Sequence, residues 1–189
     1  MPELLPMPSP SVLPIAYPLD DFYAQAGRDL PAIEPMAGDA VPEPYKSLLV
    51  HQDDMTPTLE KFHGERIHLA VLSRQQRDDF YFREVVLLLD KSDKPVEFGA
   101  IKINLALFPP AARKEILDER RPLGTLLADY AITHASRPKA FLRVQSDDFI
   151  NAALKLSQSQ WLYGRRNTLW DPQQRPLAEI VEILPMEGN

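Results

Sequence analysis

The stretch FYFREVVLLLDKSDKPVEFGAIKINL (Phe80–Leu105) contains two runs rich in β-branched and aromatic residues, separated by a short polar turn at Lys91–Pro95. Such a pattern predicts an antiparallel hairpin. In the second run, apolar residues alternate with charged ones, so that Glu97, Gly99 and Ile101 share one side of the strand. The hairpin therefore indicates a sheet that is at least partly antiparallel.

The segments around this hairpin extend the same interpretation. Strand-like runs occur at Arg66–Ser73, Lys139–Gln145, Trp161–Trp170 and Leu177–Leu184. Helical patterns occur at Tyr45–Phe62 (in two pieces, with Asp54 or Thr56 as cap and Gly64 as stop), Pro109–Glu119, Pro122–Tyr130 and Asp147–Leu156. Because strands and helices do not alternate as βαβ units, we predict an α+β fold with an antiparallel sheet.

Proline and charge divide the chain into two parts. Residues 1–44 hold ten of the 19 prolines, with seven acidic side chains and one basic one, which equals the whole net charge of −6. We expect them to form a Pro-rich acidic N-terminal arm, polyproline-like or irregular, either loosely ordered or packed on the domain through Leu13, Ile15, Tyr17 and Phe22. Residues 45–189 carry no net charge and form the predicted domain.

The composition excludes several functions. A neutral domain lacks the excess of Lys and Arg that nucleic-acid binding requires, and no apolar run is long enough to span a bilayer. Without cysteine there is no disulfide and no thiol nucleophile. The common nucleotide-binding, hydrolase and zinc-protease motifs are missing, and the spacing of His51, Asp53 and Asp54 fits no familiar metal site. We expect a cytoplasmic protein without a metal or organic cofactor.

Charged residues inside otherwise apolar strands indicate buried polar groups. Arg83 and Glu84 are neighbours in the first run of the hairpin, so one of them must face an apolar interior. In LAEIVEIL (Leu177–Leu184), Glu179 and Glu182 lie on opposite faces, and we expect at most one of them to face the core. A buried arginine facing a buried glutamate is either a structural ion pair or a site for a charged ligand.

Five motifs, in order, carry a resemblance to a known family. They are LLVHQDDMT (Leu48–Thr56), YFREVVLLLD (Tyr81–Asp90), RPLGTLL (Arg121–Leu127), LYGRRNTL (Leu162–Leu169) and EIVEILP (Glu179–Pro185). In this order and spacing the chain resembles the chorismate lyase (chorismate–pyruvate lyase) family over about residues 45–185. The resemblance implies an antiparallel sheet with helices and flaps covering a buried ligand pocket.

The resemblance also implies an activity and its residues. Family members convert chorismate to 4-hydroxybenzoate and pyruvate without a cofactor, in quinone biosynthesis, by eliminating the enolpyruvyl group. By motif position, Arg83 matches the carboxylate-binding arginine and Glu182 the glutamate of the last strand, both expected to be catalytic and substrate-binding. Met55 and Leu123 match further substrate-binding residues. We expect Glu182, with its pKa raised by burial and lowered by Arg83, to donate a proton or orient the substrate.

Two positions depart from the family pattern. Without a gap, Val181 would take the glutamate position, and Glu182 fits only if the last hairpin turn is one residue longer. Gly99–Ala100 stands where the family often has Gly-Arg, which predicts that one ligand-binding cation is absent. Of Arg165 and Arg166, one should face inward, either paired with a sheet carboxylate or supporting the ligand site.

A binding module is the alternative. The same fold resembles the effector-binding domains of some bacterial transcription regulators, which hold small ligands, such as aromatic carboxylates, without chemistry. Those domains normally follow a winged-helix DNA-binding domain, and residues 1–44 are too short, too acidic and too rich in proline to form one. The sequence thus predicts a small-molecule site for chorismate and 4-hydroxybenzoate or a related ligand, with a monomer favoured.

Overall fold

A single antiparallel sheet organises the chain in the computed structural model, which describes residues 13–188. Its strands are β1 (Ile33–Met36), β2 (Ile67–Arg77), β3 (Phe80–Leu89), β4 (Pro95–Asn104), β5 (Ala135–Gln145), β6 (Trp161–Trp170) and β7 (Pro176–Leu184). Within the described residues they follow the order β1-β5-β6-β7-β4-β3-β2, and each pair of neighbours is antiparallel. The predicted α+β fold and the β3–β4 hairpin are confirmed.

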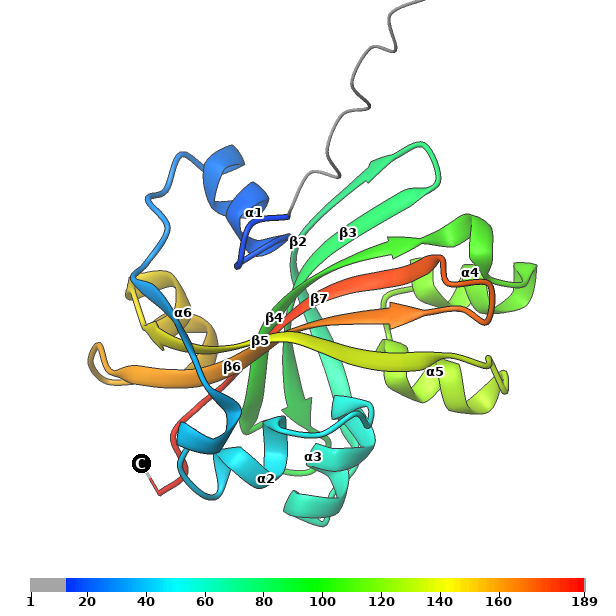
Figure 1. The fold of residues 1–189 in the computed structure, drawn as a ribbon. Coiled ribbons are helices and arrows are strands. Elements are labelled where there is room, and N and C mark those ends of the chain that lie inside the picture. Colours follow the sequence, from blue (N-terminus) through cyan, green and yellow to red (C-terminus); the bar gives the residue numbers. More distant parts are fainter. Residues whose placement is uncertain (1–12, 189) are drawn as a thin grey trace, which may run out of the picture.

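Helices cover both faces of this sheet (Figure 1). They are α1 (Leu19–Gln25), α2 (Tyr45–Leu49), α3 (Met55–His63), α4 (Pro110–Leu117), α5 (Leu123–Asp129) and α6 (Asp148–Leu154), with 3₁₀ turns at Gly38–Ala40 and Leu105–Leu107. Helices α1 and α6 pack on one face, against buried β4 and β7 side chains such as Phe98 and Val181. Helices α2 and α3 cover one part of the opposite face, and α4 and α5 cover another.

The helix ends follow the local sequence. The side chain of Asp147 accepts a hydrogen bond from the Ile150 backbone N–H and caps α6, as the sequence predicts. Gly64 ends α3 with a φ of +65°, a left-handed conformation that glycine adopts without steric cost. Asp54 occupies the N-cap position of α3 without a side-chain capping bond, because its carboxylate binds His134 instead.

The irregular conformation expected for residues 1–44 is wrong within the described part of the chain. Leu19, Phe22 and Tyr23 are buried at i, i+3 and i+4 of α1, a helical spacing that the many prolines obscure. Strand β1 pairs with β5 and forms one edge of the sheet. The expected packing through Phe22 is confirmed, and residues 1–12 lie outside the described residues. The predicted domain boundary between residues 44 and 45 stays a prediction.

Candidate functional site

The strand register places two rows of side chains on the face covered by α2 to α5. One row runs across β3, β4, β7 and β6 through the paired positions Val85, Gly99, Glu182 and Arg165. The next row contains Arg83, Ile101, Ile180 and Asn167. Because side chains alternate along a strand, both rows point to the same face. Residues from distant parts of the sequence therefore converge in the centre of the sheet.

A cavity lies over these rows, between the two apolar clusters that α2–α3 and α4–α5 form with the sheet. About 60 Å³ of it is open to the centres of water molecules, several times the ~10–15 Å³ that a single water requires. All four residues that the family resemblance singled out line this cavity, namely Met55, Arg83, Leu123 and Glu182. Their roles stay predictions, but the fold brings them to one place.

Gly99 shapes the floor of the cavity. A Cβ at this position would lie 2.5 Å from the carbonyl oxygen of Val181 on β7, so no other residue fits without moving the backbone. The same Cβ would lie 3.5 Å from Oε1 of Glu97. The missing side chain thus leaves a hollow in the sheet face, and the Glu97 carboxyl lies beside it.

Arg83 is the cation of the cavity and has few partners. Its side chain is 2% exposed, and its Nη1 donates to the Ile116 carbonyl oxygen over 3.3 Å. Its Nε has no hydrogen-bond partner, and no carboxylate of the described residues lies at ion-pairing distance. Burial lowers the pKa of the Arg83 guanidinium, although Tyr81 and Glu119 raise it. Tyr81 is also a hydrogen-bond partner of Arg83, and Glu119, which acts on Arg83 through its charge, is engaged by Tyr81 and by Arg74. A buried cation without a carboxylate of its own is well suited to bind an anion.

Glu182 pairs with Arg165, and Arg83, the arginine that was expected to act on it, is not its partner. Nε of Arg165 donates to Oε2 of Glu182 over 2.5 Å, and Arg165 is fully buried. The register explains this choice, because Arg165 lies directly opposite Glu182 on β6, whereas Arg83 lies in the neighbouring row two strands away. The Arg165 guanidinium therefore fixes the orientation of the Glu182 carboxyl group at the edge of the cavity.

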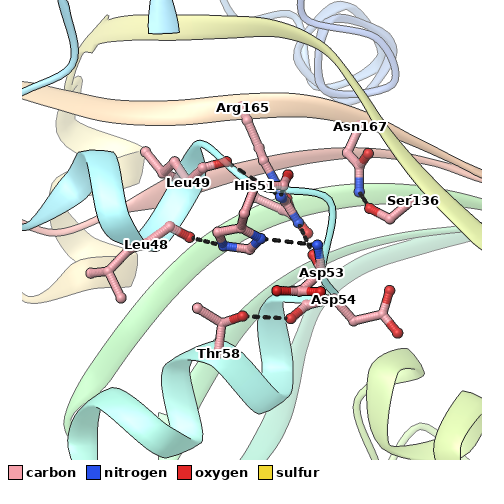
Figure 2. Close-up of polar contacts among 10 residues, drawn as sticks. Leu48, Leu49, His51, Asp53, Asp54, Thr58, Ser136, Arg165 and Asn167 are labelled. Carbon is pink, nitrogen blue, oxygen red and sulfur yellow. Dashed lines mark hydrogen bonds and ion pairs between the residues drawn. The ribbon is translucent and has the colours of Figure 1, made fainter. Parts of the chain in front are cut away.

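Arg165 also fixes the loop that closes one side of the cavity. Its guanidinium donates to the carbonyl oxygens of Leu49, His51 and Asp53, over 3.3, 3.1 and 3.0 Å (Figure 2). Three of the four remaining N–H groups of the side chain thus bind the end of α2 and the segment that leads to α3. The position of Met55, at the start of α3, depends on this attachment. The sequence pointed to Arg165 only through its GRR motif.

His51 and His134 fix the same loop from its two ends. The Asp53 backbone N–H donates to Nδ1 of His51 over 3.0 Å, so Nε2 carries the proton and donates to the Leu48 carbonyl oxygen over 2.6 Å (Figure 2). His134 lies 2.8 Å from Asp54 through Nε2 and donates through Nδ1 to the Ile132 carbonyl oxygen. The hydrogen bond with Asp54 raises the pKa of His134. His51 has no free nitrogen for a metal.

Glu97 is the cavity residue that sequence reasoning missed as a site. It is 5% exposed, and its Oε2 has no hydrogen-bond partner. Burial raises its pKa well above the ordinary value, and the neighbouring Glu182 raises it further, against the opposing influence of Arg165. Its alternation with Gly99 and Ile101 was visible in the sequence. Nothing there showed that this side of β4 would be buried over a cavity.

Asn167 contributes a second unsatisfied acceptor. Its Nδ2 donates to Oγ of Ser136 over 2.8 Å, whereas its Oδ1 has no partner (Figure 2). Buried polar atoms are nearly always hydrogen-bonded in folded proteins. Three of them without partners around one cavity, on Arg83, Glu97 and Asn167, indicate a place that a polar molecule fills.

The opposite face holds a second set of buried charges. Glu179 accepts a hydrogen bond from Thr168 Oγ1 over 2.7 Å and lies 3.6 Å from Nη2 of Arg166. The expectation that only one of Glu179 and Glu182 is buried is wrong, because helices and the N-terminal segment cover the second face as well. Each carboxylate has its own arginine.

At Ala100, where the family resemblance predicts the absence of a ligand-binding cation, the direction of the side chain decides the question. Ala100 is among the residues that line the cavity, but its side chain belongs to the cluster of Phe82, Val86 and Val181, which by strand alternation lies on the opposite face. The next residues along β4 in each direction, Gly99 and Ile101, belong to the cavity face. A side chain at position 100 is thus directed away from the cavity, and the alanine removes no cation from it.

Two further observations concern the residues from 13 to 188. No group of three or more His, Asp or Glu side chains gathers there in a way that could hold a metal ion. No helix in that range has the length and apolar character needed to cross a membrane.

Comparison with known proteins shows the fold alone. No family model matches the sequence, and no curated protein matches it. Among solved structures, the SA0254 gene product of Staphylococcus aureus aligns with a TM-score of 0.53 and 10% identity, over 72% of this chain and 90% of that one. The effector domain of PhnF from Mycobacterium smegmatis aligns with a TM-score of 0.53 and 13% identity, over the same shares.

The structure of PhnF from Mycobacterium smegmatis aligns as well, with a TM-score of 0.52 and 11% identity, over 93% of this chain and 100% of that one. At these identities the likeness concerns the fold alone. The chain therefore shares the architecture of these proteins, a seven-stranded antiparallel sheet with helices on both faces.

Proposed function

We propose that this chain is a small-molecule-binding domain whose cavity holds an aromatic carboxylate against Arg83. The observation that carries the proposal is the state of Arg83, which is buried, faces the cavity, has an Nε without a hydrogen-bond partner and forms no ion pair of its own with a carboxylate of the described residues. A ligand carboxylate can accept two parallel hydrogen bonds from a guanidinium, an arrangement that is both strong and specific. Apolar side chains from α3, α5 and the sheet would enclose the ring.

The shared architecture supports a binding role. One protein with this fold is described as an effector domain, which is a statement about PhnF and not about this chain. Ligand sites in proteins are mostly apolar cavities with a few convergent polar groups. The cavity over Gly99 has this character, with Leu69, Val85 and Leu127 among its apolar lining.

A second candidate is the chorismate lyase reaction. The observation in its favour is that Met55, Arg83, Leu123 and Glu182 lie around one cavity, as the family resemblance implies. The reaction breaks the bond between the ring and the ether oxygen of chorismate, removes the hydrogen of the neighbouring ring carbon that bears the hydroxyl, and delivers a proton to the departing enolpyruvyl group. Glu182, ion-paired with Arg165, is placed to position the substrate. A role in quinone biosynthesis and a cytoplasmic location are proposed only together with this second candidate.

Calorimetric titration with 4-hydroxybenzoate tests the binding proposal. We expect one molecule to bind per chain. Arg83→Gln should weaken binding at least tenfold, because it removes the guanidinium that binds the ligand carboxylate. Arg166→Gln is the matched control, since Arg166 also has an unpartnered Nε but lies on the opposite face. Equal affinity in wild type and Arg83→Gln, or no binding to wild type, would contradict the proposal.

Incubation with chorismate separates the two candidates. Stoichiometric release of 4-hydroxybenzoate and pyruvate above the spontaneous rate, abolished in Arg83→Gln, would establish the lyase. Binding of 4-hydroxybenzoate without turnover of chorismate is the result expected for a binding domain.

A further inference from the structure

One carboxyl group of the cavity, that of Glu97, takes part in no ion pair with the described residues. Arg165 and Glu182 neutralise each other across β6 and β7. Arg83 and Glu97 do not form a corresponding pair. Arg83 is opposite Ile101 on β4, and Ile101 is four residues from Glu97, a separation of roughly 13 Å along an extended strand. The cavity therefore has a cation at one end and a separate carboxyl group near Glu182.

The neighbours of Glu97 favour its neutral form. Glu182 is its diagonal neighbour on β7, because Gly99 pairs with Glu182 and Glu97 is two residues from Gly99. The guanidinium of Arg165 is already shared between Glu182 and three backbone carbonyls. On the helical side, Asp54 at the start of α3 pairs with His134, and the lining residues from α5 are uncharged. Burial and Glu182 together raise the pKa of Glu97.

This arrangement sets the charge of the cavity. Glu119, which acts on Arg83 through its charge, does not line the cavity and is ion-paired with Arg74. With Glu97 protonated and the Arg165–Glu182 pair neutral, Arg83 is then the positive charge of the cavity that a ligand can balance. A monoanion would balance it, whereas a dianion would bring an uncompensated negative charge into a buried site beside Glu182. The Glu97 hydroxyl, with no acceptor among the described residues for Oε2, is free to donate a hydrogen bond to the ligand.

We propose that Glu97 is a further ligand-contacting residue, and that the cavity selects a small aromatic carboxylate of single negative charge, with a polar group at its other end, over a dicarboxylate. This inference rests on the proposed binding function and adds the residue and the charge that define its ligand class. Glu97 acts as a hydrogen-bond donor at one end of the ligand, and Arg83 binds the carboxylate at the other.

The charge selection is tested with two probes of the same shape. Terephthalate carries two carboxylates, and 4-carbamoylbenzoate replaces one of them with an uncharged amide. In calorimetric titrations of the full chain at pH 7, we expect 4-carbamoylbenzoate to bind at least tenfold more tightly than terephthalate. Equal affinity, tighter binding of terephthalate, or exclusion of both while 4-hydroxybenzoate binds would overturn selection by charge. Failure to bind 4-hydroxybenzoate as well would instead overturn the proposed function.

The role of Glu97 is tested with three variants. Glu97→Leu removes the donor and should weaken binding of 4-carbamoylbenzoate at least tenfold, whereas Glu97→Gln keeps a neutral donor and should stay within about threefold of wild type. Glu84→Gln, a buried glutamate on the opposite face, should bind as wild type does. Thermal unfolding of each variant verifies that it is folded. Undiminished binding by Glu97→Leu, or equal losses in Glu97→Leu and Glu97→Gln, would overturn the assignment.

Discussion

Arg83 and Glu84 are consecutive residues of β3 that face opposite sides of the same sheet. Both are about 2% exposed, and both have a side-chain atom without a hydrogen-bond partner. Arg83 faces a cavity that contains further polar groups without partners. Glu84 faces the layer of α1 and α6, near Arg28 and Asp147, and does not line the cavity. The comparison teaches that a buried charge marks a ligand site only when open space and complementary groups accompany it.

The ion pairs of the two faces sharpen this distinction. On the opposite face, Arg166 and Glu179 are about 11% exposed and lie 3.6 Å apart. On the cavity face, Arg165 is fully buried and makes four hydrogen bonds, three of them to the loop before α3. The first pair joins two neighbouring strands, β6 and β7, whereas the second connects the sheet to the wall of the cavity.

The largest effect on stability is expected from Arg165→Met. Removing this guanidinium leaves the Glu182 carboxylate buried without a partner and frees three loop carbonyls, which should lower the free energy of unfolding by about 3–5 kcal/mol. Urea denaturation measures the loss. The double variant Arg165→Met/Glu182→Leu should recover a substantial part of it, because it removes the uncompensated charge. If the double variant is no more stable than the single one, the pair is not the source of the loss.

A pH-dependent effect is expected on the opposite face, at Glu84. Burial raises the pKa of Glu84 from its ordinary 4.5 to about 7 in the folded protein. The folded state therefore holds this proton more tightly than the unfolded state, and its ionisation reduces the stability of the wild type as pH rises from about 4.5 to about 7.

Glu84→Gln should remove this loss of stability. At pH 8 the variant should be more stable than wild type, by on the order of 2 kcal/mol, and at pH 4 the two should be similar. Urea midpoints measured at both values check the difference. A variant destabilised equally at pH 4 and pH 8 would show that Glu84 contributes a hydrogen bond and not an ionisation cost.

Arg83→Met is expected to affect binding and stability in opposite directions. Its positive charge is buried without an ion pair of its own, so an apolar side chain of similar length should leave the free energy of unfolding unchanged or raise it by about 1 kcal/mol, although binding is lost. Thermal and urea unfolding without ligand measure this. A loss above about 2 kcal/mol would identify Arg83 as a structural residue and weaken its contrast with Arg165.

The smallest effect is expected at His134. Its hydrogen bond with Asp54 raises the pKa of the folded imidazole. The stabilisation is therefore fully present below about pH 6.5, the unfolded pKa, and is lost as pH rises through the raised folded value. His134→Gln should cost less than about 1 kcal/mol at pH 5.5, and less still at pH 9. A cost that does not change with pH would contradict a charged His134.

Much of the fold was predictable because local patterns decide it. The hairpin Phe80–Leu105, the capped helix after Asp147 and the glycine stop at Gly64 each depend on neighbours in sequence. The N-terminal segment was not predictable in this way. The apolar spacing of α1 is short and interrupted by prolines. Strand β1 is fixed by pairing with β5, more than 100 residues away.

For the site, strand parity predicted the face of Glu182 and the alternation of Glu97 with Gly99. Neither the Arg165–Glu182 pairing nor the cavity beside Glu97 could be predicted, because both depend on the order of β4, β7 and β6 in the sheet. The same register shows that position 100 faces away from the cavity, which its sequence neighbours do not reveal.

Nuclear magnetic resonance of arginine side chains tests the central claim most directly. The Nε–H of Arg83 and that of Arg166 are both without partners in this structure, so each reports on its own face of the sheet. On titration with 4-hydroxybenzoate, the Arg83 Nε–H resonance should shift strongly and saturate at one ligand per chain, while that of Arg166 stays in place. An unchanged Arg83 resonance at saturation, or a shift at Arg166 alone, would contradict a carboxylate site at Arg83.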